Sequence, residues 1–308
     1  MIKNKKALVL LNMGAARSKD ELEVFLTNMF NDQNILPIKN DTLRSMLASL
    51  IVTLRVNKIW ESYELIGGKS PLHDFTDLLV KKLEKALPEY FITVAMRYTS
   101  IFAQTAIAKI KKENINDVVL LPLYPHYSTT TTKSSVEDFI EKANGVFTIR
   151  TVEPFYKNEL YNKTICDKIL QVQAKYTDYH IIFSAHGLPQ KVVKNGDPYQ
   201  KQIEEHVELL KEKLSHYATT FKSINLAYQS KVGPFKWLTP SLENMLKHFK
   251  NEKVIIYPIS FIVDNSETVF ELDIEYREIA KKLNLKDYKV CTCVNDNDTF
   301  VNVIKEII

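Results

Sequence analysis

The sequence has 308 residues, of which 45% are hydrophobic and 25% charged, with a formal net charge of +4. These values are typical of a globular protein with one large or two ordinary domains, and they argue against a nucleic-acid-binding surface. No run approaches the roughly 20 apolar residues that a membrane-spanning helix needs, and we expect no signal peptide. We therefore expect a cytoplasmic protein.

Short apolar runs alternate with helical patterns along the whole chain, which predicts βαβ units and parallel sheets. The predicted strands form two groups of four that divide near residue 155. They are Lys6–Leu11, Phe91–Met96, Asp117–Leu123 and Val146–Val152, then Tyr179–Ser184, Ser223–Tyr228, Lys253–Ile259 and Tyr288–Val294. Predicted helices cover 71–86, 103–112, 134–143, 157–174, 197–214, 240–249, 270–282 and 298–307. We predict two similar halves with a ligand cleft between them.

Residues 41–66 form a long insertion between the first two predicted strands, and their pattern predicts one or two amphipathic helices. The apolar stripe of this segment consists of Met46, Leu47, Leu50, Ile51 and Leu54. Most such stripes face a core. A lid over an apolar ligand is the alternative.

The hydroxyl-rich segment from Tyr124 to Ser135 follows the third predicted strand. Its hydroxyl and backbone N–H groups could hold carboxylates or phosphates, or could simply cap a helix. The segment Gly67–Ser70 resembles the end of a phosphate-binding loop, but it lacks the upstream glycine and preceding strand, so we reject nucleotide binding.

A histidine, His186, stands at the carboxyl end of a predicted buried strand, just before Gly187 and Pro189. Ligands of open α/β sheets bind past the carboxyl ends of strands, so His186 could accept protons or bind a metal ion. An ordinary structural histidine is the alternative.

Glu267, Glu271 and Glu275 follow the seventh predicted strand at i, i+4 and i+8, so a helix would place them on one face. Such a row could bind a metal ion or accept protons. A solvated helix face is the alternative. The chain has three cysteines, Cys166, Cys291 and Cys293; we interpret the last two as buried thiols of the eighth strand rather than a metal site.

Together these segments resemble the ferrochelatase family of tetrapyrrole metal chelatases over nearly the whole chain. The residues that carry the resemblance are Leu10–Gly14, Phe183–Pro189, Tyr228–Pro234 and Ser266–Asp273. The resemblance implies an α/β fold of two Rossmann-like domains, residues 1–155 and 156–308. Each would be a four-stranded parallel sheet flanked by helices, with the active-site cleft between them.

The resemblance also implies the activity: insertion of Fe²⁺ into protoporphyrin IX, which forms protohaem at the last step of haem synthesis. The family's essential histidine and glutamate match His186 and Glu267, which would serve as catalytic residues and metal ligands. Glu271 and Glu275 match a path for metal or protons. Residues that would contact the porphyrin are Met13, Arg55, Tyr63, Ser70 and Arg97.

We further expect Tyr124, Lys231 and Trp237 to contact the substrate, because aromatic rings suit the macrocycle while basic and hydroxyl groups suit its propionates. The family's mechanism also needs strain: a tight apolar cleft can bend the flat macrocycle and expose its nitrogen lone pairs.

Two departures from the family pattern matter. Asn265 stands where many members carry histidine, which places more weight on His186 and Glu267. Thr129 stands where animal enzymes carry a cysteine of their iron–sulfur cluster, so we expect no cluster and no permanently bound cofactor, with Fe²⁺ as a substrate.

Several alternatives stay open from the sequence. The chain could insert another metal such as cobalt, or use another tetrapyrrole such as coproporphyrin, although Met13 favours protoporphyrin because enzymes for coproporphyrin usually carry tyrosine there. It could also carry haem or porphyrin without turnover. Contact with a membrane surface or with another haem-pathway enzyme, and the oligomeric state, are left open.

Overall fold

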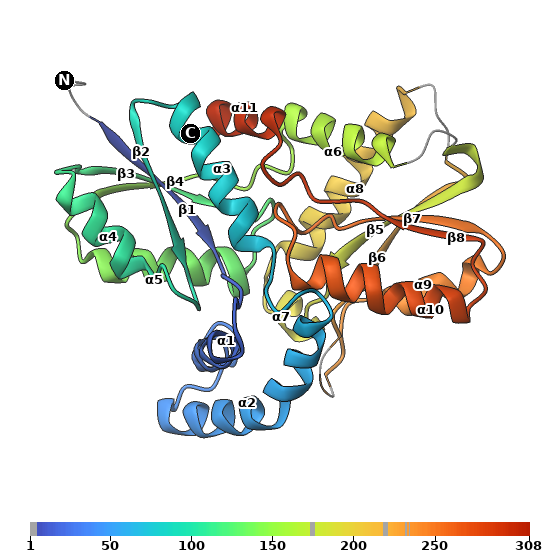
Figure 1. Ribbon diagram of the computed structural model, residues 1–308, viewed down its shortest axis with the longest axis horizontal. Helices are drawn as coiled ribbons and strands as arrows, with labels where there is room; N and C mark the ends of the chain where they lie inside the picture. Colours follow the sequence, from blue (N-terminus) through green and yellow to red (C-terminus); the bar gives the residue numbers. More distant parts are fainter. Residues whose placement is uncertain (1–4, 173–175, 218–220, 232, 234) are drawn as a thin grey trace. The chain divides into compact units, whose positions relative to one another are not determined.

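The computed structural model describes residues 5–172, 176–217, 221–231, 233 and 235–308 (Figure 1). The described chain forms two compact units. The first contains the residues up to Tyr124, together with Ser128–Glu153 and Ile304–Ile308; the second contains Pro125–Tyr127 and Pro154–Val303. Our assignment of domains to residues 1–155 and 156–308 stays a prediction.

The first unit is built on a four-stranded parallel sheet, as predicted. Its strands are β1 (Lys6–Asn12), β2 (Tyr90–Met96), β3 (Asp117–Pro122) and β4 (Thr148–Thr151), in the order β2-β1-β3-β4. On one face, Ala7, Val9 and Leu11 pack under α4 (Ala103–Lys112) and α5 (Ser134–Ala143). The alternate residues Leu8 and Leu10 are also fully buried, so both faces of the sheet are covered. The helix α3 (Leu72–Ala86) precedes β2.

The second unit repeats this arrangement with β5 (Tyr179–His186), β6 (Ser223–Gln229), β7 (Lys253–Tyr257) and β8 (Asp287–Val290), in the order β6-β5-β7-β8. Figure 1 shows α9 (Leu242–Leu246) and α10 (Tyr276–Lys282) on one side of this sheet and α6 (Glu159–Gln171) on the other. The remaining helices of this unit are α7 (Gln190–Lys194), α8 (Tyr199–Ser215) and α11 (Asp298–Ile307), the last of which continues into the first unit. The end of the predicted helix 157–174 lies outside the described residues.

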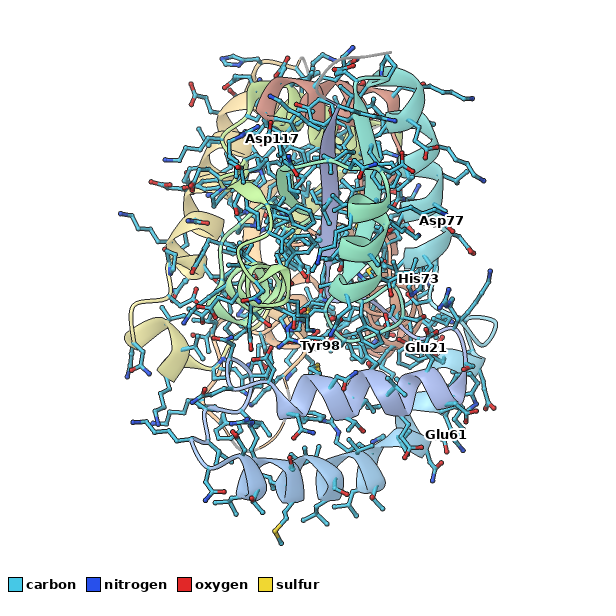
Figure 2. All side chains as sticks on the ribbon, turned by 90° about the vertical axis from the view of Figure 1, so that its left-hand side faces the viewer. Glu21, Glu61, His73, Asp77, Tyr98 and Asp117 are labelled. Carbon is cyan, nitrogen blue, oxygen red and sulfur yellow. The ribbon has the colours of Figure 1, made fainter. Side chains whose placement is uncertain are left out.

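The insertion between β1 and β2 begins with two helices, α1 (Lys19–Asn31) and α2 (Asp41–Glu64). Figure 2 shows them as successive layers, with α1 between α2 and the labelled Tyr98. The face of α2 toward α1 packs through Val52, Val56 and Trp60. Of the segment 41–66, residues Asp41–Glu64 thus form a single long helix. In its apolar stripe Leu47 and Ile51 are half-buried, whereas Met46, Leu50 and Leu54 are exposed.

Two buried histidines of the second unit contact each other: His126, in the segment after β3, and His206, in α8. His126 Nε2 lies 2.9 Å from His206 Nδ1, and His206 Nε2 lies 2.8 Å from Asn162 Oδ1. Burial lowers the pKa of His206 to about 3, and that of His126 lies well below its usual value for the same reason. Both imidazoles are therefore neutral in the folded protein.

Several predicted bounds differ from the structure, among them those of β7, β8 and the helix predicted at 270–282. The eighth strand ends at Val290 rather than Val294, so Cys291 and Cys293 follow it, although both are buried free thiols as predicted. Its partner β7 ends at Tyr257, because Pro258 has no backbone N–H to continue the ladder. The predicted helix 270–282 is instead a π-helical segment, η4 (Glu267–Glu275), followed by α10. A second π-helical turn, η1 (Thr129–Lys133), precedes α5.

No helix in the described part of the chain is both long enough and apolar enough to cross a membrane.

Candidate functional site

His186 is the last residue of β5, at the carboxyl end of an inner strand. It pairs with Gln229 of β6, and the next residue, Gly187, donates its N–H to the carbonyl of Gln229 at 2.9 Å. A Cβ atom on residue 187 would lie only 2.6 Å from that carbonyl oxygen. The chain can therefore turn directly after the histidine only because residue 187 is glycine.

The His186 side chain contacts the side chain of Glu267. His186 Nδ1 lies 2.7 Å from Glu267 Oε2, and the two side chains are 36% and 35% exposed, so a substrate can reach them. Burial disfavours a charge on either group, but their mutual attraction and hydrogen bond outweigh it. The pKa of His186 is therefore raised and that of Glu267 lowered, which makes His186 a stronger proton acceptor.

Glu267 is held at the start of η4 by Asn265. The Asn265 side-chain oxygen accepts the backbone N–H of Glu267 at 2.8 Å, as a helix-capping residue does. Asn265 is nearly buried, and its side-chain amide donates to the carbonyl of Val263. The asparagine that departs from the family pattern thus has a structural role in this chain.

Ser230 connects Glu267 to the next carboxylate of the row. Its hydroxyl lies 2.9 Å from Glu267 Oε2 and also contacts Glu271, while its backbone N–H donates to Glu271 Oε1 at 2.7 Å. Burial and the neighbouring negative charge of Glu267 raise the pKa of Glu271 to about 7. Glu275, further along η4, is exposed. The structure therefore brings two of the three predicted glutamates together with His186.

Lys231 and Trp237 belong to the loop after β6. Lys231 is exposed, and Trp237 is half-buried beside the turn at Gly187, with its backbone bridged to Pro189. Residues 232 and 234 of the same predicted motif lie outside the described residues. Substrate contacts by these two side chains stay predictions.

In the first unit, Met13 follows β1 directly and is half-buried, with its carbonyl accepting the N–H of Tyr98 at 2.9 Å. Gly14 has a φ of 90°, and a Cβ there would lie 2.2 Å from Thr99 Oγ1. The glycine thus lets the β1 and β2 loops approach each other closely. Tyr124, just past β3, is half-buried, and its hydroxyl lies 3.0 Å from Ser135 Oγ.

Arg97 lies in a network of opposite charges rather than facing solvent freely. Its guanidinium contacts Asp32 and Asp138, each at 3.0 Å, and donates to Ser134 Oγ at 2.9 Å. Asp32 also accepts the hydroxyl of Tyr98 at 2.8 Å. Burial would raise the pKa of Asp32, but hydrogen bonds from Ser134 and neighbours and the charge of Arg97 lower it. The positive charge of Arg97 is therefore already balanced by two carboxylates, and its predicted contact with the porphyrin stays a prediction.

The other predicted porphyrin residues of the first unit lie on or just after α2. Arg55 is half-buried on this helix, and Tyr63 is buried with its ring stacked 6.0 Å from that of Trp60. Ser70 is buried, and its N–H donates to the carbonyl of Ala16 at 3.0 Å. Their roles toward a substrate stay predictions.

Sequence reasoning missed the residues that support His186 and Glu267. Asn265 was recognised as an N-cap residue type before the helix, but its bond to Glu267 was not predicted, and Ser230 was only one residue of the motif Tyr228–Pro234. An Asn two residues before a helical glutamate is a recognisable capping signal. The contact of Ser230 with both glutamates had no such signal, because it depends on a β6 loop packing on η4. Among the described residues, no group of three or more His, Cys, Asp or Glu side chains is arranged to hold a metal ion.

Solved structures show a similar fold. The chain resembles SirB from Bacillus subtilis with Fe³⁺, with a TM-score of 0.60 and 11% identity over 98% of this chain and 95% of that one. It also resembles the sirohydrochlorin chelatase SirB from Bacillus subtilis subspecies spizizenii in complex with cobalt, with a TM-score of 0.58 and 9% identity, covering 99% and 94% of the chains. The chain thus has the fold of the metal chelatases.

Sequence similarity is more specific. The ferrochelatase family model matches residues 5–308. The chain is 49% identical to the ferrochelatase of a Nitratiruptor species, over 98% of both proteins, and 47% identical to that of Sulfurimonas denitrificans, also over 98% of both. It therefore belongs to the ferrochelatase family, which confirms the resemblance seen in the sequence.

Proposed function

We propose that this chain is an enzyme that inserts ferrous iron into protoporphyrin IX and so forms protohaem in haem synthesis. Membership of the ferrochelatase family supports this activity. The observation that carries the mechanism is the 2.7 Å contact between His186 Nδ1 and Glu267 Oε2 at the carboxyl end of an inner strand. The same match does not favour a chelatase for cobalt or coproporphyrin, or a non-catalytic carrier.

We assign proton removal to His186. Metal insertion displaces two pyrrole N–H protons, so a base must lie close to the ring nitrogens. An ionised Glu267 only accepts hydrogen bonds, so His186 Nδ1 carries the proton between them and Nε2 keeps the lone pair. Nε2 is therefore the atom that takes one pyrrole proton, and Glu267 stabilises the imidazolium that forms. The second pyrrole proton would leave along the carboxylates of Glu271 and Glu275.

We assign the metal to the same pair and its neighbours. A nitrogen and a carboxylate oxygen form a mixed donor set that can hold Fe²⁺ and release it again. Glu271 lies next to Glu267 through Ser230, and Glu275 is exposed at the end of the row, so these two residues would provide the path for metal or protons. The residues proposed to contact the porphyrin are Met13, Arg55, Tyr63, Ser70, Arg97, Tyr124, Lys231 and Trp237.

The test is an anaerobic assay with Fe²⁺ and protoporphyrin IX that follows loss of porphyrin fluorescence and gain of the haem spectrum. We expect turnover by the wild type and none by His186→Ala, with His248→Ala as an exposed-histidine control. Parallel reactions with Co²⁺ and with coproporphyrin measure specificity. Tight porphyrin binding without turnover by the wild type would contradict the proposal and favour a carrier.

We also propose that no cofactor is permanently bound and that Fe²⁺ enters only as substrate. An iron–sulfur cluster of the usual kind needs four cysteine ligands, whereas the sequence has three. Burial raises the pKa of each thiol, which disfavours the thiolate that a cluster would need. Anaerobically purified protein should lack the visible absorption and acid-labile sulfide of a cluster; finding both would contradict this assignment.

We propose further that the outward face of α2 contacts an anionic membrane surface, where an apolar porphyrin would partition. Leu43, Met46, Leu50 and Leu54 are 56–73% exposed and recur at helical spacing. No Asp or Glu occurs between Thr42 and Trp60, and every charged residue there is basic. An exposed apolar stripe with basic residues beside it suits a helix lying in the interface of anionic lipids.

Vesicle flotation tests this contact. We expect binding to vesicles that contain phosphatidylglycerol, weaker binding to pure phosphatidylcholine, and loss of binding in Leu54→Asp. Leu78→Asp, at another exposed leucine of the same unit, should bind as the wild type does. The proposal would be contradicted if Leu54→Asp and Leu78→Asp bound the vesicles equally. It would also be contradicted if the wild-type protein self-associated and bound neither kind of vesicle.

A further inference from the structure

The backbone of His186 extends beyond the strand that would normally pair with it. On one side, β5 pairs with β6 as far as His186 and Gly187. On the other side, the β5–β7 ladder ends at Phe183 and Tyr257. The N–H of Ile259 reaches the carbonyl of Ser184 at 3.1 Å, and beyond this point no strand among the described residues pairs with the N–H and C=O of His186 on this side.

Two side chains replace the missing strand. The N–H of His186 donates to Ser260 Oγ at 3.0 Å, and the hydroxyl of Tyr199 donates to the carbonyl of His186 at 2.9 Å. The Tyr199 and Ser260 hydroxyls lie 2.6 Å apart. Since the single proton of Tyr199 is used on the carbonyl, Ser260 must be the donor between them. The three residues form a closed ring in which each N–H or O–H donates once.

The ring joins three separate elements on one residue. Tyr199 is the first residue of α8 and is 7% exposed, Ser260 lies in the turn after β7, and His186 ends β5. The amide of Tyr199 donates to Asp197 Oδ1 at 3.0 Å, so its own backbone is fixed. The ring therefore fixes both peptide groups that flank the Cα of His186, and with them the direction in which the imidazole leaves the strand.

We propose that Tyr199 and Ser260 are positioning residues that aim the His186 imidazole at Glu267 and the substrate. The inference rests on the proposed role of His186 as proton acceptor. A proton acceptor must be held within a fraction of an ångström of its partner, and small misplacements of such groups lower rates severely. Neither side chain needs to touch the porphyrin or the metal.

The variants that test this inference remove one hydroxyl at a time. Tyr199→Phe removes the donor to the His186 carbonyl, and Ser260→Ala removes the acceptor of the His186 N–H. Ser260→Thr keeps a hydroxyl at the same position. Tyr257→Phe is a matched control, because Tyr257 is fully buried in β7 of the same sheet and its hydroxyl has no hydrogen-bond partner among the described residues.

Steady-state kinetics gives the first readout. We expect Tyr199→Phe and Ser260→Ala to lower kcat about tenfold with the porphyrin KM changed less than about twofold, the double variant to lose no more than about the larger single loss, and Ser260→Thr to recover most of the rate. A kcat within about twofold of wild type in both single variants, or a loss that appears only in KM, would overturn the proposal.

Amide exchange gives a second readout that needs no turnover and so separates this inference from the proposed function. We expect the His186 amide to exchange faster in Ser260→Ala and in Tyr199→Phe, and at the wild-type rate in Tyr257→Phe. Unchanged protection of that amide in both ring variants would overturn the proposal even if the protein proves not to be a chelatase.

Discussion

Glu267 concentrates two hydrogen bonds on one oxygen. Its Oε2 atom contacts both His186 Nδ1 and Ser230 Oγ, so the charge of that carboxylate directly supports a proton on the imidazole. The charge, rather than the shape, of the side chain should therefore matter most.

Glu267→Gln tests this reasoning, because it keeps the shape and removes the charge. The pKa of His186 should fall, since the attraction that raises it is lost, and kcat should drop on the order of 10². The measurement is kcat in the anaerobic assay, with Glu278→Gln, at an exposed glutamate of α10, as the control. A nearly normal rate would remove Glu267 from the mechanism.

Ser230 adopts a left-handed backbone, with a φ of 61°, that favours glycine over other residues. Ser230→Gly relieves this strain, whereas Ser230→Ala keeps it, and both lose the hydroxyl that contacts Glu267 and Glu271. We expect Ser230→Gly to be more stable than Ser230→Ala by about 1 kcal/mol in urea unfolding. An alanine variant as stable as the glycine variant would show that the backbone there relaxes freely.

At this scale, His186 and Glu267 could be predicted because a histidine at a strand end and a glutamate in an acidic row leave visible patterns. Ser230, Tyr199 and Ser260 could not, because their roles come from side chains of distant segments that meet only after folding.

Among the elements, η4 is the one on which the carboxylates depend. It begins at Glu267, and its first N–H bonds to the side chain of Asn265. Its spacing of glutamates predicted a helix correctly, but the sequence could not reveal that the turns are π-helical, since such turns are rare and occur mostly within α-helices.

Asn265→Ala should lower the free energy of unfolding by about 1 kcal/mol, the usual cost of a lost helix cap. Asn265→Asp should retain most of the stabilisation, because a carboxylate oxygen can also accept the N–H. The activity of Asn265→Ala should fall less than that of His186→Ala, because Asn265 supports Glu267 without accepting a proton. Chemical denaturation and the iron-insertion assay measure the two effects. An activity loss equal to that of His186→Ala would contradict this order.

The helix α1 was missed in the sequence although its start carries a signal. Ser18 caps it by accepting the N–H of Glu21 at 3.2 Å, and a serine followed three residues later by glutamate is a capping pattern. Its apolar residues Leu22, Phe25, Leu26 and Met29 recur at helical spacing. The sequence of α1 itself therefore contained the signals that predict this helix. The ends of β7 and β8, in contrast, depend on the pairing between the two strands, which Pro258 interrupts.

Across the whole molecule, the two units share one strand order, in which the first strand of each lies between the second and the third. That repetition was predictable from two groups of four apolar runs. The composition of the units was harder to predict, because three residues after β3 and five at the end of the chain each pack with the other unit.

The stability of the whole chain should fall as the solution becomes acidic. Since His206 has a pKa of about 3 when folded and about 6.5 when unfolded, the unfolded chain binds more protons between these values. Its contribution is complete above pH 6.5 and is lost below it, at about 1.4 kcal/mol per pH unit, and His126 acts in the same direction.

Urea unfolding at pH 6.5 and 5.5 measures this effect. His206→Asn should reduce the difference in unfolding free energy between the two pH values, whereas His248→Asn, at an exposed position, should leave it unchanged. The same pH dependence in wild type and His206→Asn would contradict the buried, neutral state of the pair.

The close approach at Gly187 has a consequence for protein engineering. With the Gln229 carbonyl so near, His186 cannot be grafted alone onto the end of another parallel strand. A designer would have to transplant the glycine after it and the turn in which the neighbouring strand ends, together with the two hydroxyls that bond to the His186 backbone. The smallest set of residues that could be transferred to another protein is therefore the strand end with its surroundings. These residues span more than seventy positions of the chain, from His186 to Ser260.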